Sequence, residues 1–465
     1  MNLNDTIAAV STPRGKGGVA MIRISGEDAV ALAERVFLCA SKKPLGAAPS
    51  AKMVRGRIID VADGHEIDDG MAAVFRAPYS FTGENTVEIY CHGGVLVTEQ
   101  VLCSVLLAGA RVAEAGEFTR RAFVNGKMSI SEAEALGALL EAKTTGQARL
   151  ARGGMMGHLA KKTHEIYDSL LTVMTGIYAA IDFPDEDLNE FSREEIATVL
   201  WQSVREIEGL AATYKTGRAV SEGIQTVICG KANAGKSSVY NRIVGYDAAI
   251  VTDIEGTTRD VLRQTATLGS TTLLLCDTAG IRQTSDTVES IGIERALDEL
   301  EGAELILAVF DSSASTDSDD EYLLRRIDTL KESGAACIAL LNKSDLPAND
   351  MLIDTIRLHF DTCIKISAAT GDGFDELSSA IDALFIDGSI SLGEDAVVTG
   401  ARQHAALLLA SESLKSSLEE LDAGTPLDLV SVGIESALTN IGMLDGRQLG
   451  EEIVAEIFSK FCVGK

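Results

Sequence analysis

The spacing of apolar residues changes along the chain, and the first part combines two periodicities. Short apolar runs at residues 19–24, 71–75 and 86–90 have the length of buried strands. A longer apolar stretch at 95–108 has the length of a helix. The pattern therefore predicts an α+β domain over residues 1–125.

Two later blocks repeat apolar residues at steps of three and four, which predicts helices. The first block includes 166–181 and 201–210, and the second includes 407–421 and 453–461. Between the blocks, about 170 residues alternate strand-like runs with helical stretches, as in α/β domains. Because domain insertion is tolerated where chain termini lie close together, we expect this α/β unit to be inserted into one discontinuous helical domain. The predicted boundaries are 1–125, 126–216 (helical, first part), 217–387 (α/β) and 388–465 (helical, second part).

A glycine-rich turn opens the α/β unit, between the apolar strand 224–229 and a helix at 237–244. Its glycines let the backbone N–H groups face phosphate oxygens, Lys236 adds a positive charge, and Ser237 offers a hydroxyl to Mg²⁺. The alternative is a surface turn with an exposed lysine, which the flanking strand and helix disfavour. The candidate phosphate contacts are Gly230, Asn233, Ala234, Gly235, Lys236, Ser237 and Ser238.

Two strand ends later in the unit supply residues suited to reading a base. The carboxylate of Asp345 can accept hydrogen bonds from guanine N1–H and its exocyclic amine, which adenine cannot match, and a polar site of this kind discriminates by about 10⁴-fold. Ser367 and Ala368 fall where a second base-contacting loop belongs, although an ordinary strand end is the alternative. The candidate base contacts are Asn342, Lys343, Asp345, Ser367 and Ala368.

Two further stretches predict the switch elements of a nucleotide hydrolase. Thr258 can complete the Mg²⁺ shell opposite Ser237, and Asp277 can hold a metal-bound water. Four stretches, at residues 230–237, 252–260, 277–280 and 342–345, occur in this order and predict that the chain binds GTP and GDP with Mg²⁺ and hydrolyses GTP. The candidate residues here are Thr252, Asp253, Ile254, Glu255, Gly256, Thr257, Thr258, Asp277, Thr278, Ala279 and Gly280.

Ile281 stands where many small GTPases have a glutamine that orients the attacking water. An isoleucine cannot do this, so either hydrolysis is very slow or other groups orient the water and supply positive charge. An arginine finger is worth about 10³ to 10⁵ in rate. The nearby candidates are Arg282, Asp286 and Glu289, and a solvated loop is the alternative for each of them.

The formal net charge of −28 argues against broad adhesion to nucleic acid or to anionic membranes. Any RNA contact must therefore be local. Residues 1–60, with nine Lys or Arg against five Asp or Glu, are one possible patch, and chance composition is the alternative. Residues 312–320 are polar and acidic, which predicts a surface loop.

Eight cysteines without a Cys-x-x-Cys pair predict reduced, buried thiols in a cytoplasmic protein. No run approaches 18 apolar residues and the amino terminus lacks a leader pattern, so we expect no membrane insertion.

Over its whole length the sequence resembles the MnmE family of tRNA modification GTPases, also called TrmE. The resemblance implies an amino-terminal tetrahydrofolate-binding α+β domain that dimerises, a discontinuous all-α domain and an inserted Ras-like P-loop G domain. Besides the nucleotide motifs it rests on Asp5-Thr-Ile7, Gly15-Lys-Gly-Gly-Val19, Ser80-Phe-Thr-Gly-Glu84, His92-Gly-Gly94, Gly116-Glu-Phe-Thr119, Arg121-Ala-Phe123, Ala180-Ile-Asp-Phe-Pro-Asp-Glu186, Ile291-Gly-Ile-Glu-Arg295 and Phe461-Cys-Val-Gly-Lys465.

The resemblance also implies a partner and a reaction. With an FAD-containing MnmG protein, in a heterotetramer or larger complex, the homodimer would add an aminomethyl or carboxymethylaminomethyl group at C5 of the wobble uridine of certain tRNAs. The one-carbon donor would be a 5-formyl or 5,10-methylene tetrahydrofolate. A ribosome-assembly GTPase, acting as an RNA-binding timing factor, is the alternative, but the sequence lacks the basic RNA-binding module such proteins normally have.

Residue roles follow from the same resemblance. K⁺ at the interface of two G domains would replace the arginine finger, bound by Asn233 and by the loop at Thr252, Ile254 and Thr257. Glu289 would orient the water, and Cys462 matches a cysteine important in the family, with a structural thiol as the alternative. The folate residues would be Arg23, Glu88, Lys127 and Lys465. Without the resemblance, Arg23 and Glu88 are predicted to be exposed strand residues.

Overall fold

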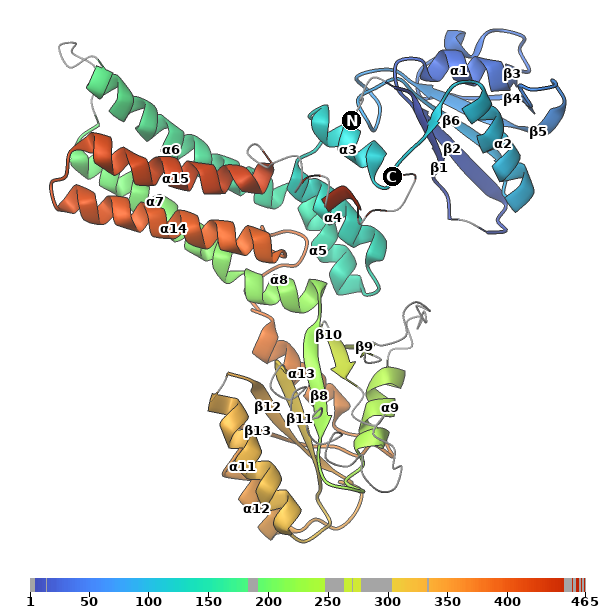
Figure 1. The fold of residues 1–465 in the computed structure, drawn as a ribbon. Helices are drawn as coiled ribbons and strands as arrows, with labels where there is room; N and C mark the ends of the chain where they lie inside the picture. The colour runs from blue at the N-terminus through green and yellow to red at the C-terminus, as the bar shows by residue number, and fades with distance from the viewer. Residues whose placement is uncertain are drawn as a thin grey trace, which may run out of the picture. The chain divides into compact units, whose positions relative to one another are not determined.

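The structure, a computed structural model, describes two compact units, and each is described here by itself (Figure 1). Unit 1 comprises 1–137 with 441–465, and unit 2 comprises 138–440. The described residues are 5–13, 15–182, 191–246, 263–269, 271–276, 303–332, 334–446, 454, 457–459, 461 and 464.

Unit 1 is built on a seven-stranded sheet in the order β3-β4-β5-β6-β2-β1-β7. All neighbours in it are antiparallel except β1 and β7. Its elements are β1 (Ile7–Val10), β2 (Val19–Ser25), α1 (Ala29–Val36), β3 (Phe37–Cys39), a 3₁₀ turn (Leu45–Ala47), β4 (Met53–Ile59), β5 (Glu66–Phe75), β6 (Thr86–His92), α2 (Val95–Leu107), β7 (Arg111–Val112), α3 (Glu117–Val124) and α4 (Ile130–Glu141).

Alternation along the central strands decides which side chains form the core of unit 1. Ile22 and Ile24 of β2 and Ile89 of β6 pack with residues of α1 and α2. Because successive side chains of a strand point to opposite faces, Arg23 and Glu88 lie on the other face of the sheet. The predicted strands and the helix at 95–108 are confirmed.

The helical part of unit 2 contains long amphipathic helices that lie alongside one another (Figure 1). In α14 the residues Leu407, Leu414, Leu418 and Leu421 are buried at helical spacing, and Glu208 of α7 pairs with Lys415 of α14. The predicted helical periodicity is therefore confirmed. The helices are α5 (Thr145–Met155), α6 (His158–Asp182), α7 (Arg193–Ala212), α8 (Tyr214–Ser221), α14 (Ala401–Asp422) and α15 (Leu427–Asp445).

One described helix, at 427–444 in α15, is long and apolar enough to cross a membrane by length and composition alone. Ser417 Oγ of α14 donates a hydrogen bond to the Val430 carbonyl of this helix, 3.0 Å away. A helix packed in this way against a neighbour is equally expected in the core of a helical bundle.

The α/β part of unit 2 has a six-stranded sheet in the order β13-β12-β11-β8-β10-β9, parallel except for β9. Residues of α9 and α13 pack on one face and residues of α11 and α12 on the other. The elements are β8 (Ile224–Cys229), α9 (Lys236–Tyr246), β9 (Arg263–Leu268), β10 (Thr271–Cys276), β11 (Leu305–Asp311), α11 (Ser318–Glu332), β12 (Ala336–Asn342), α12 (Asp350–Arg357), β13 (Thr362–Lys365) and α13 (Phe374–Phe385).

The chain enters and leaves the α/β domain at neighbouring points. The Asp387 N–H donates to Thr216 Oγ1 at 3.0 Å, and the Val398 N–H donates to Thr213 Oγ1 at 3.0 Å. The α/β domain is thus inserted into the helical domain. The exact boundaries 125/126, 216/217 and 387/388 stay predictions.

Two expectations about local environment are wrong. Residues 312–320 do not form a simple surface loop, because α11 begins at Ser318 and the side chains of Ser312 and Asp320 are buried. Among the cysteines whose side chains the structure describes, Cys103 is exposed on α2, so not all of the thiols are buried. The exposure of the Asp320 side chain depends on an ion pair with Lys231, and that of Cys103 depends on the face of α2 on which it lies. Local composition predicts neither.

Candidate guanine nucleotide site

The glycine-rich loop begins where β8 ends, and two of its glycines are required by close contacts. Gly230 has φ +149°, and a Cβ there would clash with the Val309 carbonyl oxygen. Gly235 has φ +101°, and a Cβ there would clash with Asn342 Nδ2. The loop is therefore held tightly between β11 and β12, with its N–H groups beside the first turn of α9.

Lys236 is the first residue of α9, and its ammonium group folds back over the loop. Its Nζ donates to the carbonyl oxygens of Gly230 and Lys231, each at 2.8 Å. Burial lowers the pKa of Lys236 because a desolvated ammonium is disfavoured. A phosphate group beside this ammonium would offset that cost, which suits the lysine to an anion.

The amide of Asn342 joins the loop to the base-reading segments. Its Nδ2 donates to the Ala234 carbonyl at 2.9 Å, and its Oδ1 accepts from the Ala368 N–H at 3.0 Å. The side chain is buried, so both bonds are shielded from water. Three segments far apart in the sequence are thereby fixed at the carboxyl edge of one parallel sheet, where α/β proteins bind ligands.

Asp345 lies beside the loop after β13. One of its carboxylate oxygens accepts from Ser367 Oγ at 2.6 Å, and the same Oγ accepts from the Thr370 N–H at 3.2 Å. Ser367 thus orients the carboxylate proposed to read guanine. The structure brings Asn342, Asp345, Ser367 and Ala368 together, as the strand ends predicted.

Two lysines of the site are held by acids that sequence analysis did not assign. Lys343 Nζ lies 2.6 Å from Asp311 Oδ2 at the end of β11. Lys231 Nζ lies 2.7 Å from the buried Asp320 and 3.0 Å from Asp317. The acidic segment 312–320 therefore anchors the glycine-rich loop. In the sequence, only the excess of acids in this segment pointed to these ion pairs.

Some predicted site residues lie outside the described residues. They comprise most of the switch segments, the proposed water-orienting acid, the candidate cysteine and one folate residue. These residues are Thr252, Asp253, Ile254, Glu255, Gly256, Thr257, Thr258, Asp277, Thr278, Ala279, Gly280, Glu289, Cys462 and Lys465.

A second candidate site lies in unit 1, on the sheet face opposite α1 and α2. Arg23 and Glu88 are paired across β2 and β6, with Arg23 Nη2 at 2.9 Å from Glu88 Oε1. Their side chains are 15% and 13% exposed, so the prediction of exposed strand residues is wrong. The pairing of oppositely charged side chains across the strands explains the burial.

Aromatic groups surround this ion pair. The Arg23 guanidinium lies 5.3 Å from the centre of the Phe81 ring and 5.7 Å from that of Phe118. The Tyr90 hydroxyl donates to Glu88 Oε2 at 2.5 Å. Burial, together with the neighbouring Glu88 carboxylate, raises the pKa of Tyr90 to about 12. The face thus combines a charged pair with flat apolar rings.

Lys127 borders the loop that contains Phe81. Its Nζ donates to the Pro78 carbonyl at 3.0 Å, and its side chain lies against Gly83. Near the carboxyl terminus, Ser11 Oγ donates to the Gly464 carbonyl at 2.8 Å, so this end of the chain packs on the end of β1. Lys127 and Arg23 thus both contact the 78–84 loop, Lys127 at Pro78 and Gly83 and Arg23 at Phe81.

A buried ion network supports the 78–84 loop, and sequence analysis assigned it no role. Arg121 is 1% exposed, and its guanidinium contacts Asp5 at 2.8 Å, Glu117 at 3.0 Å and Glu84 at 3.2 Å. Arg111 adds a second cation, 2.7 Å from Glu117. Four of these five residues, all except Arg111, occur in the motifs quoted above, but their pairing depends on the fold and could not be predicted from those motifs.

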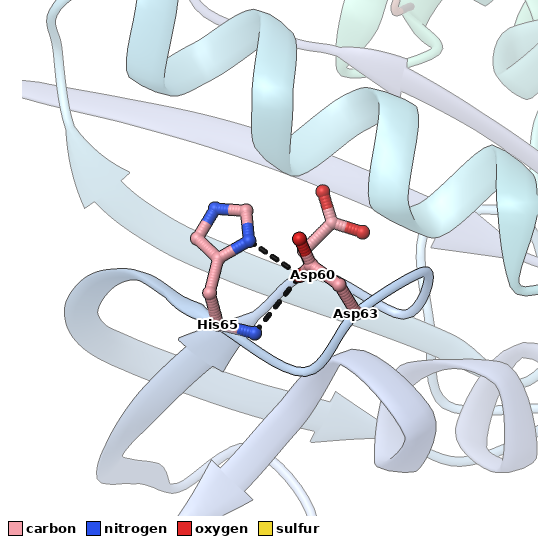
Figure 2. Close-up of side chains that lie close together, drawn as sticks. All are labelled: Asp60, Asp63 and His65. Atoms are coloured by element: carbon pink, nitrogen blue, oxygen red, sulfur yellow. Dashed lines mark hydrogen bonds and ion pairs between the residues drawn. The ribbon is translucent and has the colours of Figure 1, made fainter.

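Two groups of Asp and His side chains lie in the same unit, one at the turn between β4 and β5 and the other across β5 and β6. Figure 2 shows the first, Asp60, Asp63 and His65, and the second is Asp68, Asp69 and His92. The N–H and ring Nδ1 of His65 both bond to Asp63 Oδ1. Such bonds account for exposed Asp and His groups in a turn without any metal ion.

A glycine-rich loop and an Asn-Lys-x-Asp segment at the carboxyl edge of a parallel sheet define a P-loop protein of the Ras-like, GTP-binding class. The family described as "GTP-binding protein TrmE N-terminus" matches residues 6–127, and "MnmE helical domain" matches residues 130–462. The chain belongs to the MnmE family of tRNA modification GTPases.

Relatives match over full length. A "tRNA modification GTPase MnmE" from Carboxydothermus hydrogenoformans is 37% identical over 465 residues, covering 100% of both chains. One from Geobacillus kaustophilus is 39% identical over 466 residues, covering 99% of both. Among solved structures, the protein Era with MgGDPNP and a fragment of 16S ribosomal RNA is 27% identical, with a TM-score of 0.29 over 41% of this chain and 66% of that one.

Proposed function

We propose that this chain hydrolyses GTP to support modification of the wobble uridine of certain tRNAs at C5, with an FAD-containing MnmG partner. The observation that supports it most is the Asn342 amide, which joins the glycine-rich loop to the loop of Ser367 and Ala368 beside Asp345. That arrangement offers one end to phosphates and the other to guanine. Family membership adds tRNA as the substrate.

The chain's own residues account for nucleotide binding. Lys236 and the loop N–H groups would hold the phosphates, and the Ser237 hydroxyl in the first turn of α9 would hold Mg²⁺. Asn233, with φ +63° in the loop, offers an amide oxygen, a suitable ligand for K⁺. Bound metal ions would neutralise charge on the phosphates. Glu289 would orient the attacking water.

Arg23, Glu88 and Lys127 fit a tetrahydrofolate derivative. A carboxylate suits the donor edge of a pterin, aromatic rings beside Arg23 suit its flat face, and a lysine suits a glutamate tail. Lys465 would add a second cation and Cys462 a thiol. When bound, the folate supplies a one-carbon unit. The proposal further includes a homodimer, a complex with MnmG and a cytoplasmic location.

Two experiments test the proposal. Deleting the gene and analysing tRNA nucleosides by mass spectrometry should remove the wobble C5 substituent, and unchanged nucleosides would disprove the tRNA function. Separately, GTP turnover by the full chain should be faster in KCl than in NaCl. Equal turnover in the two salts would contradict the role of K⁺ while leaving GTP binding intact.

The ribosome-assembly alternative receives no support, because the family match extends across both the amino-terminal and helical domains. Analysis of ribosomal subunits in the same deletion strain would test it. We expect normal subunit ratios.

A further inference from the structure

One segment of this acidic chain has the opposite charge balance. Residues 142–164 contain no Asp or Glu, whereas they contain Lys143, Arg149, Arg152, Lys161 and Lys162. The whole chain has a formal net charge of −28. Within this segment the charge is therefore positive, which suits it to contact a polyanion.

The fold turns these cations outward. In α5 the side chains of Leu150 and Ala151 are buried, and Leu150 packs with Val220 and Val397. Arg149 and Arg152 are exposed and three residues apart, so they lie on neighbouring positions of the helix surface. Lys143 just before α5 and Lys161 in the first turns of α6 are also exposed. Lys143, Arg149, Arg152 and Lys161 are called the α5 basic surface below.

The cations of this surface are available to a partner. Among the residues that the structure describes, no ion pair is formed by any of the four. The neighbouring Lys162 instead pairs with Glu165 at 3.2 Å. Arginines without an internal carboxylate keep their fork of N–H donors for phosphate oxygens.

The patch predicted at residues 1–60 differs in this respect. Arg23 pairs with Glu88, Arg55 with Asp69 and Arg57 with Glu66. Acids from elsewhere in unit 1 thus neutralise part of its positive charge. The structure therefore favours the α5 basic surface over residues 1–60 as a place for phosphate contacts.

We infer that the α5 basic surface contacts the phosphate backbone of the tRNA substrate. This inference rests on the proposed function, since family membership points to tRNA as the polyanion. Contacts to phosphates carry no sequence information and so fit a protein that accepts more than one tRNA. Phosphate contacts at this surface also explain how a chain with a formal net charge of −28 can approach RNA directly.

The test replaces three surface cations in the full chain, Arg149→Gln, Arg152→Gln and Lys161→Gln. A matched triple variant, Arg205→Gln, Arg325→Gln and Arg357→Gln, removes the same charge from exposed helix positions elsewhere in unit 2. Affinity for bulk tRNA is measured by fluorescence anisotropy between 50 and 200 mM KCl, with and without the MnmG partner. GDP affinity, which no replaced residue should affect, reports on folding.

We expect the α5 triple variant to bind tRNA about tenfold or more weakly at the lowest salt, with a log–log salt slope smaller by about 2 to 3, since each lost phosphate contact removes about 0.7 to 0.9. The matched variant should stay within about twofold of the parent, since long-range effects of exposed charges are screened by salt. A conservative variant, Arg149→Lys with Arg152→Lys, should retain most of the affinity.

Equal losses in the two triple variants would show a general charge effect and overturn the inference. Unchanged tRNA binding by the α5 triple variant would overturn it as well. If the parent protein bound no tRNA with or without its partner, the proposed function would fail together with this inference. If the parent protein binds tRNA normally, either of the first two results contradicts only the role of the α5 basic surface. The proposed function would then remain intact.

Discussion

The nucleotide site and the Arg23–Glu88 face are built in different ways. In the nucleotide site, the glycine-rich loop, Asn342 and Asp345 each follow directly from the end of a parallel strand, and backbone groups supply much of the chemistry. On the Arg23–Glu88 face, side chains from β2 and β6 meet through an ion pair, and the 78–84 loop adds the Phe81 ring beside Arg23. The first site is encoded locally, and the second depends on long-range pairing.

This difference determines what a mutation should do. A change at the nucleotide site should alter ligand contacts and leave the fold intact, because each loop follows from the end of a strand of the parallel sheet. A change in the ion network of Arg121 should destabilise unit 1, because Glu117 is buried against two cations. The predictions below test this contrast.

The largest effect is expected for base selection. Asp345→Asn replaces a hydrogen-bond acceptor by a donor, and this donor matches the carbonyl group of xanthine. The preference for guanine over xanthine should therefore shift by about 10⁴-fold, as for other polar recognition sites. Binding of GDP and XDP is measured by calorimetry. The control Asp354→Asn, at an exposed acid that lies 3.9 Å from Arg357, should leave the preference unchanged. An unaltered preference in Asp345→Asn would disprove the assignment.

The next effect concerns the stability of unit 1. Arg121→Met removes one of the two cations that contact the buried Glu117 and leaves only Arg111, and breaking a buried pair costs up to about 3 to 5 kcal/mol. Thermal unfolding should show the loss, whereas GDP affinity should not change. Arg55→Gln, which removes an exposed pair with Asp69, should cost at most about 1 kcal/mol. Equal losses for the two variants would contradict the role of burial.

A smaller effect is expected for the connection between nucleotide loops. Asn342→Ala leaves the Ala234 carbonyl and the Ala368 N–H unpaired, which costs about 1 to 3 kcal/mol in stability of the ordered loops. GDP must then order the loops when it binds, so its affinity should fall. The matched variant Asn349→Ala removes the cap of α12 and should affect stability but not GDP affinity. Loss of affinity in both variants would mean that Asn342 acts only through folding.

The smallest effect is a dependence of stability on pH. A hydrogen bond from Arg111 lowers the pKa of Asp5, and in Glu117 burial opposes but does not outweigh the bonds that lower its pKa. Both carboxylates therefore stabilise unit 1 above their ordinary pKa of about 4, and this contribution is lost as the pH falls through the lowered values. Arg111→Gln should flatten the loss of stability below about pH 4 in acid titrations followed by circular dichroism. An unchanged slope would contradict this account.

The same contrast explains how far the sequence could be interpreted. The periodicity of β2, β6, α7 and α14 located those elements, and the strand-end motifs located Gly230, Asn342 and Asp345. The burial of Arg23 and Glu88 could not be predicted, because it depends on the register between strands more than 60 residues apart. The Lys231 ion pairs with Asp317 and Asp320 were missed for the same reason.

The fold also determines whether the positive side chains of a basic segment are paired with acids or remain exposed. The positive balance of residues 1–60 suggested a patch, yet its arginines find acids on neighbouring strands. The cations of α5 lie in a segment with no acid at all, and their exposure follows from which helix face packs inward. Composition alone could not distinguish these two cases.

The most direct test of the central claim is a calorimetric titration of the full chain with GDP and, in parallel, with ADP, in buffer containing Mg²⁺. The arrangement of Lys236, Asn342 and Asp345 predicts saturable heat with GDP and none with ADP. No heat with GDP, or equal binding of the two nucleotides, would contradict the account.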